Sequence, residues 1–171
     1  MFDMYSWFKT GLLVFGILAG MATIFVLSPQ SRPIFTWLFP VGKIPRIEFD
    51  ILQPPKTPNN FLVCPKDYCV FGADKEAPVY DMPVNKLRNI FFEAMELNPY
   101  MSIEKNYDDV DQFDIVERSR YFAFPDIMTV RFFKRGEDKS TLAIYSRSVY
   151  GRYDFGVNRE RVEKLLRIIR P

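Results

Sequence analysis

Side chains able to bind a charged group are concentrated between Ser146 and Arg161, in the sequence SRSVYGRYDFGVNRER. This segment holds four arginines, two tyrosines, two glycines and one aspartate. Guanidinium groups bind carboxylates and phosphates through paired hydrogen bonds, so the segment is the first candidate for a binding site. The residues that we expect to contact a ligand there are Arg147, Asp154, Asn158, Arg159 and Arg161.

Two interpretations of this segment compete. In the first, backbone N–H groups around Asn158 open a helix and, together with Arg159 and Arg161, form a pocket for an anion. In the second, Asp154 accepts hydrogen bonds from Arg147 or Arg152, and a buried ion pair joins the last strand to the last helix. We favour the ion pair, because networks of charged side chains are more often structural than functional.

The absence of histidine narrows the chemistry further. It excludes Ser-His-Asp and Cys-His catalysis, and zinc sites built on histidine. A hydrolase or transferase that uses Asp154, Tyr150 or Tyr153 would lack an evident base. An enzyme that uses Asp, Glu, Tyr, Lys or Arg is not excluded, but we favour a protein without catalytic activity. We predict no catalytic residue, no metal and no cofactor.

Charge is distributed unevenly although the net charge is only +2. Lys43 to Glu117 carries 8 basic and 14 acidic side chains, whereas Arg118 to Pro171 carries 13 basic and 6 acidic ones. Such an asymmetry is typical of two faces that pair within one fold. The total is too small for nucleic-acid binding, so no nucleic-acid partner is expected.

An uncharged segment near the amino terminus, Gly11 to Leu27, contains 17 residues. As a helix it spans roughly 25 Å, and with Trp7, Phe8 and Ser28 it approaches the ~30 Å of a bilayer core. The Leu-Ser-Pro sequence that follows lacks the small residues of a signal-peptidase site. We predict a retained single-pass anchor rather than a cleaved signal peptide.

The two cysteines determine on which side of the membrane we predict the domain to lie. Cys64 and Cys69 are the only cysteines, and their spacing suits a small disulfide loop in an oxidising compartment, although two inert thiols would also fit. The predicted organisation is a cytoplasmic tail (residues 1–10), a transmembrane anchor (11–28), an interfacial linker (29–57) and a periplasmic domain (58–171).

The anchor and linker also carry candidate contact surfaces. Gly16 and Gly20, continued by Thr23, form a small face that permits close helix approach in a bilayer. The alternative is that glycine is simply common in membrane helices. The aromatic stretch Ile34–Phe39 is suited to the membrane interface or to a neighbouring protein. The expected partners are therefore membrane lipid and other transmembrane proteins.

Periodicity predicts the elements that position these residues. Apolar residues at helical spacing follow Pro83 and end before Asn98, and a second helix is predicted from a cap at Asn158 to about Ile169. Alternation predicts strands at residues 46–52, 101–106, 113–124, 127–134 and 140–148. The fold class is α+β: an amino-terminal membrane helix followed by an antiparallel sheet with two helices packed on one face.

Several of these motifs resemble the domain-of-unknown-function family 1499, whose members occur in bacteria and plastids. The matching residues are Tyr121–Asp126 (YFAFPD), Val130, Ser146–Ser148 (SRS), Gly151, Asp154, Gly156–Arg159 (GVNR) and Arg161. The resemblance runs from about Pro58 to Ile169, and Asn59–Cys69 is similar to the alphaproteobacterial, membrane-anchored type. It implies a location in the bacterial inner membrane and domain limits, but no activity or cofactor.

The predicted function is that of a periplasmic accessory protein that is anchored in the membrane and docks on a larger membrane protein complex. The alternative is a module that binds an anionic small molecule or a lipid headgroup through the arginines between residues 147 and 161.

Overall fold

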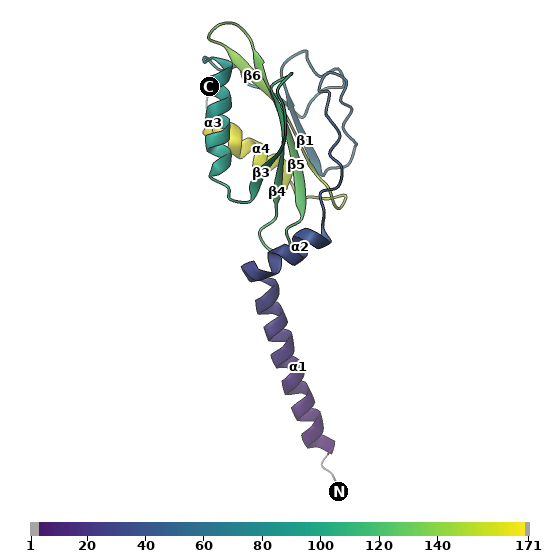
Figure 1. Cartoon of the computed structure of the whole chain (residues 1–171). Coiled ribbons are helices and arrows are strands. Elements are labelled where there is room, and N and C mark those ends of the chain that lie inside the picture. Colours follow the sequence, from purple (N-terminus) through teal and green to yellow (C-terminus); the bar gives the residue numbers. More distant parts are fainter. Residues whose placement is uncertain (1–3, 170–171) are drawn as a thin grey trace.

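In the computed structural model, which describes residues 4–169, a long helix projects from one end of a domain built on a six-stranded sheet (Figure 1). The helical segments are α1 (Met4–Val26), η1 (Pro29–Ser31), α2 (Arg32–Leu38), α3 (Val84–Glu96) and α4 (Val157–Ile168). The strands are β1 (Asn60–Cys64), β2 (Lys75–Glu76), β3 (Met101–Tyr107), β4 (Gln112–Arg118), β5 (Pro125–Lys134) and β6 (Ser140–Ser148).

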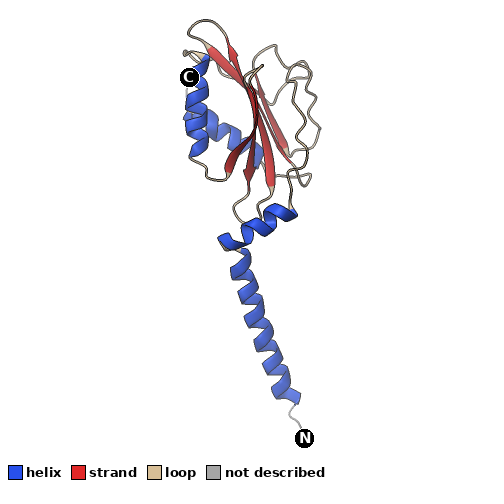
Figure 2. Ribbon diagram, viewed as in Figure 1, coloured by secondary structure: helices blue, strands red, loops and turns tan. Residues whose placement is uncertain are grey.

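The sheet has the order β2-β1-β6-β5-β4-β3. Its pairs are antiparallel except for β1 and β2, which run parallel. Helices α3 and α4 lie on one face of the sheet, and loops cover the other (Figure 2). The predicted α+β class is therefore confirmed.

The face beneath the helices holds the main core. Alternate residues of β5 (Met128, Val130 and Phe132) point toward the helices. Phe91 of α3 packs its ring 5.4 Å from that of Phe132, and Leu165 of α4 joins the same cluster. The helical spacing of the apolar residues in α3 and α4 thus buries one side of each helix against the sheet.

The second face is covered by an irregular segment, residues 40–59, which we call the covering segment. Ile47 and Phe49 are buried against Leu62 and Tyr145, and the Gln112 side-chain amide donates a hydrogen bond of 3.0 Å to the Ile47 carbonyl. The strand predicted at residues 46–52 is wrong. Ile47 and Phe49 alternate because they pack on the sheet face, not because this segment pairs with a strand.

The structure differs from the predicted strands at two further places: one strand was missed and one is shorter than predicted. β1, Asn60–Cys64, was not predicted, although it lies between β2 and β6. The strand predicted at residues 113–124 ends at Arg118, because the chain turns there. The Ser119 N–H donates to the Phe124 carbonyl at 2.9 Å, and Ala123 has a φ of 50°.

The edge strand β3 is mostly exposed. Its register with β4 shifts between Ile103 and Lys105, so Glu104 is an additional residue in the ladder, as in a β-bulge. The Lys105 ammonium donates a hydrogen bond of 2.8 Å to the Ile44 carbonyl. The edge strand is thereby tied to the covering segment.

Helix α1 contains one stretch, Trp7–Val26, that is long and apolar enough to cross a membrane. Ser31 joins it to η1, since its buried hydroxyl lies 2.9 Å from the Val26 carbonyl oxygen and 2.8 Å from that of Ser28. On the domain side, Arg32 donates to the carbonyl of Arg120 at 2.6 Å. The domain is therefore connected to α1 through packed helical turns rather than through a loose linker.

Candidate functional site

Arg161 of α4 is the last residue of the segment Ser146–Arg161 and lies at the centre of a network of ion pairs and hydrogen bonds. Its guanidinium forms ion pairs with Glu117 of β4, through Nε, and with Asp126 of β5, through Nη2 at 2.6 Å. Nη1 donates to the Ser146 hydroxyl of β6 at 2.9 Å and to the Asn158 side-chain oxygen at 2.6 Å. The Arg161 side chain is only 6% exposed. We call these five residues the Arg161 cluster.

This geometry supports a buried ion pair between the last helix and the sheet, but the pairs are formed by Arg161 with Glu117 and Asp126 and do not involve Asp154. Arg161 contacts three neighbouring strands at once, so it fixes α4 to β4, β5 and β6. All of the guanidinium nitrogens that it carries are used within the cluster. Four of the five N–H donors of Arg161 thus have partners within the cluster, which indicates a structural role.

Asn158 is fully buried in the first turn of α4. Its side-chain oxygen accepts hydrogen bonds from Ser146 at 2.6 Å and from Arg161. Its side-chain N–H groups are close to the Ser148 hydroxyl (3.0 Å) and to Asp154 (2.8 Å). Asn158 was predicted as the helix cap, and this is wrong, since α4 begins at Val157.

Asp154 performs the capping role instead. Its carboxylate accepts hydrogen bonds from the backbone N–H groups of Gly156 (3.0 Å) and Asn158 (2.9 Å). Burial by itself would raise the pKa of Asp154, but these N–H groups lower it, and the net pKa lies below the usual value. An ionised carboxylate at the start of a helix also interacts favourably with the helix dipole.

Arg147 lies on the opposite face of the sheet, beneath the covering segment. Its Nη1 is 3.3 Å from the Thr129 hydroxyl, and its guanidinium carbon is 5.1 Å from the centre of the Tyr145 ring. Burial lowers the pKa of Arg147, and within the described residues its buried Nη2 has no hydrogen-bond partner. The expected pairing of Asp154 with Arg147 or Arg152 is absent from residues 4–169, because the sheet separates Arg147 from Asp154.

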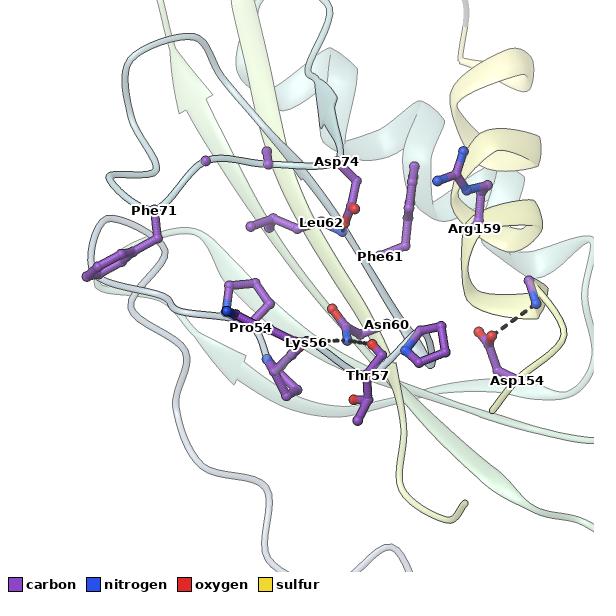
Figure 3. Close-up of a pocket in the computed structure, with 15 residues that line it drawn as sticks. Pro54, Lys56, Thr57, Asn60, Phe61, Leu62, Phe71, Asp74, Asp154 and Arg159 are labelled. Carbon is purple, nitrogen blue, oxygen red and sulfur yellow. Dashed lines mark hydrogen bonds between the residues drawn. The ribbon is translucent and has the colours of Figure 1, made fainter. Parts of the chain in front are cut away.

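Arg159 and Asp154, two of the predicted binding residues, line an open cavity (Figure 3). The guanidinium carbon of Arg159 lies 4.8 Å from the centre of the Phe61 ring, and no carboxylate within residues 4–169 pairs with it. The cavity has a volume of about 550 Å³. Its walls come from the proline-rich part of the covering segment, from β1, from the turn before β2 and from the start of α4.

The charges around this cavity are mixed. Asp74 and Asp154 both line it, but each carboxylate already accepts backbone hydrogen bonds, Asp74 from the Leu62 N–H at 2.8 Å. Lys56 and Arg159 line it as well and have no ion pair among the described residues. The charged side chains of the cavity that lack an ion pair or a backbone hydrogen bond within residues 4–169 are thus cationic.

Cys64 and Cys69 form a disulfide, as predicted, with their Cα atoms 6.2 Å apart. The bond joins the end of β1 to the turn that follows it. Within residues 4–169, no group of three or more histidine, cysteine, aspartate or glutamate side chains is placed to hold a metal ion.

Glu117, Asp126 and Ser146 complete the Arg161 cluster, but none was predicted as a site residue. Glu117 and Asp126 are directly paired across β4 and β5, and Ile115 and Met128 of the same face belong to the core. Carboxylates at positions of two adjacent strands where apolar residues are expected were therefore the signal in the sequence that could have identified Glu117 and Asp126.

Comparison with known proteins adds one match. The family model described as "Protein of unknown function (DUF1499)" matches residues 50–169. This span contains the whole sheet, α3, α4 and the Arg161 cluster, and it leaves out α1 and α2. The resemblance inferred from the motifs is thereby confirmed. No protein with a curated description matches the chain.

Proposed function

The chain belongs to the DUF1499 family, whose description carries no activity, and we propose that it is a membrane-anchored accessory protein that docks on a larger membrane protein complex. The observation that supports this proposal is the short connection between α1 and the domain. Only Leu27 and Ser28 separate α1 from η1, and α2 packs on the domain. The domain is therefore held beside the bilayer, where its accessible partners are other membrane proteins.

The disulfide supports a periplasmic domain in a bacterial inner membrane. Disulfides persist in oxidising compartments and are rare in the cytosol. The Cys64–Cys69 bond is the only cysteine pair that the chain has, and within the described residues no thiol is left free.

The proposed contact surface is the small face of α1, continued by the outer side of α2. Side chains from Trp7 to Phe25 are exposed along α1, and a Cβ atom added at Gly16 or Gly20 would meet no atom within 4 Å. The chain's own fold therefore does not require these glycines. In α2, Phe35 packs inward while Ile34, Trp37 and Leu38 remain exposed.

We expect Gly20→Leu to abolish co-purification of the partner complex in mild detergent, because a large side chain blocks close helix approach. Ala22→Leu is the matched control, since Ala22 lies on another side of α1 and should leave co-purification unchanged. A photo-crosslinking residue at Thr23 should capture the same partner, and one at Phe25 should not. The proposal fails if the protein purifies alone, or if both leucine variants behave identically.

A second candidate function rests on Arg159. Its guanidinium borders the 550 Å³ cavity without a carboxylate partner among the described residues, so we propose that the cavity binds a phosphate-bearing small molecule or lipid headgroup. Arg147 and Arg161 are not part of this site, because neither of them lines the cavity.

Inorganic phosphate and glycerol phosphate should therefore raise the melting temperature of the wild-type protein. Arg159→Glu should remove this effect, whereas Arg152→Glu, an equally exposed arginine in the preceding loop, should retain it. An effect of phosphate that both variants lose equally would reflect general charge screening and would overturn the site.

A further inference from the structure

Two loops at the α2 end of the sheet expose aromatic side chains. One is the turn 119–124 between β4 and β5, and the other is the loop 149–156 between β6 and α4. The exposed fractions are 44% for Tyr121 and Phe122, 71% for Tyr153 and 95% for Phe155. We call these four residues the aromatic rim. Clustered exposed aromatic side chains are unusual on a soluble surface and indicate an interaction site.

The turn between β4 and β5 lies beside α2, at the end of the domain from which α1 projects (Figure 1). α2 begins six residues after the end of α1 and packs on the turn 119–124, and the residues that follow α2 contact the loop 149–156. The Phe35 ring is 5.5 Å from that of Phe122, and the Tyr150 hydroxyl donates a hydrogen bond of 2.7 Å to the Pro40 carbonyl. Both loops that carry the rim therefore contact the segment that connects the domain to α1.

The charges near the rim suit lipid headgroups. Residues 4–47 contain four basic side chains and no acidic one. Arg120 and Arg152, one in each loop, are exposed and form no ion pair within the described part of the chain. Aromatic rings and basic side chains together are typical of protein segments that lie in the membrane interface.

Each loop contains one residue other than glycine with a positive φ. Phe155 has a φ of 55° and Ala123 a φ of 50°, in the left-handed region that residues other than glycine rarely adopt. For Phe155 the result is a nearly fully exposed ring, whose nearest aromatic neighbour is Tyr153 at 6.5 Å. Strained, exposed positions of this kind are common at functional surfaces.

We propose that the aromatic rim inserts into the interfacial layer of the bilayer that α1 spans, with Arg120 and Arg152 placed at the lipid phosphates. The partner of this surface is the lipid bilayer itself. The inference depends on α1 crossing that bilayer and is independent of the protein partner proposed above.

Tryptophan quenching tests the insertion on the full chain. The two native tryptophans are first replaced (Trp7→Phe and Trp37→Phe), and a single reporter is introduced as Phe155→Trp. The protein is reconstituted in vesicles of brominated phosphatidylcholine with phosphatidylglycerol. We expect the reporter to lose roughly half of its emission relative to unbrominated vesicles, because interfacial side chains lie within reach of the brominated chains.

Val79→Trp in the same background is the matched control. Val79 is exposed at 53% and precedes Tyr80, which bridges to Ser140 at the opposite end of β6. This reporter should not be quenched. Equal quenching at positions 79 and 155, or none at either, overturns the inference. So does a 155 reporter that is shielded from water but unaffected by bromine, because a protein would then cover the rim. Loss of the partner complex in Gly20→Leu does not alter these outcomes.

Discussion

Replacing Arg161 with methionine is expected to lower the free energy of unfolding by about 3–5 kcal/mol. Methionine is similar in length and apolar, so the packing of α4 is largely retained. The substitution leaves the carboxylates of Glu117 and Asp126, whose side chains are 21% and 17% exposed, close together and without their cation. Urea unfolding of the full chain in detergent, followed by near-ultraviolet circular dichroism, measures the loss.

Arg159→Met is the matched control, since Arg159 is exposed and lies on the same helix. Its contact with the Phe61 ring limits the expected loss to about 1 kcal/mol. Neutralising the stranded acids in Arg161→Met/Asp126→Asn should recover part of the stability. If Arg161→Met is no more destabilising than Arg159→Met, the Arg161 cluster does not hold α4 to the sheet.

Asn158→Ala is expected to lower the free energy of unfolding by about 2–4 kcal/mol, because several buried groups lose their hydrogen-bond partner together. These include the Ser148 hydroxyl and the Asn59 carbonyl, which accepts from the Asn158 amide at 3.2 Å. The same unfolding experiment measures the effect.

Asn89→Ala provides the comparison, since Asn89 is exposed within α3 and its replacement should change stability by no more than about 0.5 kcal/mol. Asn158 and Arg161 share a hydrogen bond, so their double variant should be less destabilised than the sum of the single variants. Strict additivity would show that the two side chains act independently, contrary to the observed geometry.

Elements with a strong one-sided pattern were predictable. The helix predicted after Pro83 agrees with α3, because apolar residues at helical spacing form its one buried side. The strand predicted from Ser140 to Ser148 agrees with β6, although most of β6 is buried on both faces of the sheet. β1 was missed because its residues are buried on both faces of the sheet, and a short continuous apolar run has no period. Residues 46–52 show the reverse case, where alternating burial occurs without strand pairing.

The candidate site was predictable as a segment but not as a set of contacts. Local sequence placed Asp154, Asn158 and Arg161 around the start of the last helix. The partners of Arg161 lie on β4 and β5, and only strand register determines that Glu117 and Asp126 meet beneath α4. Arg147 was misassigned because residues one apart on a strand point to opposite faces, so it could not share a pocket with residues near Ser146.

The bulge in β3 affects how the sheet edges of neighbouring copies in one membrane could pair. Copies that α1 anchors in one membrane would be confined to a plane in the same orientation, so their sheet edges would meet at the same height. A regular exposed strand would invite edge-to-edge pairing between neighbours. The register shift at Glu104 interrupts the ladder that such pairing requires, while the opposite edge, β2, has only two residues. The sheet can thus be present at high density in the membrane without offering a continuous edge for aggregation.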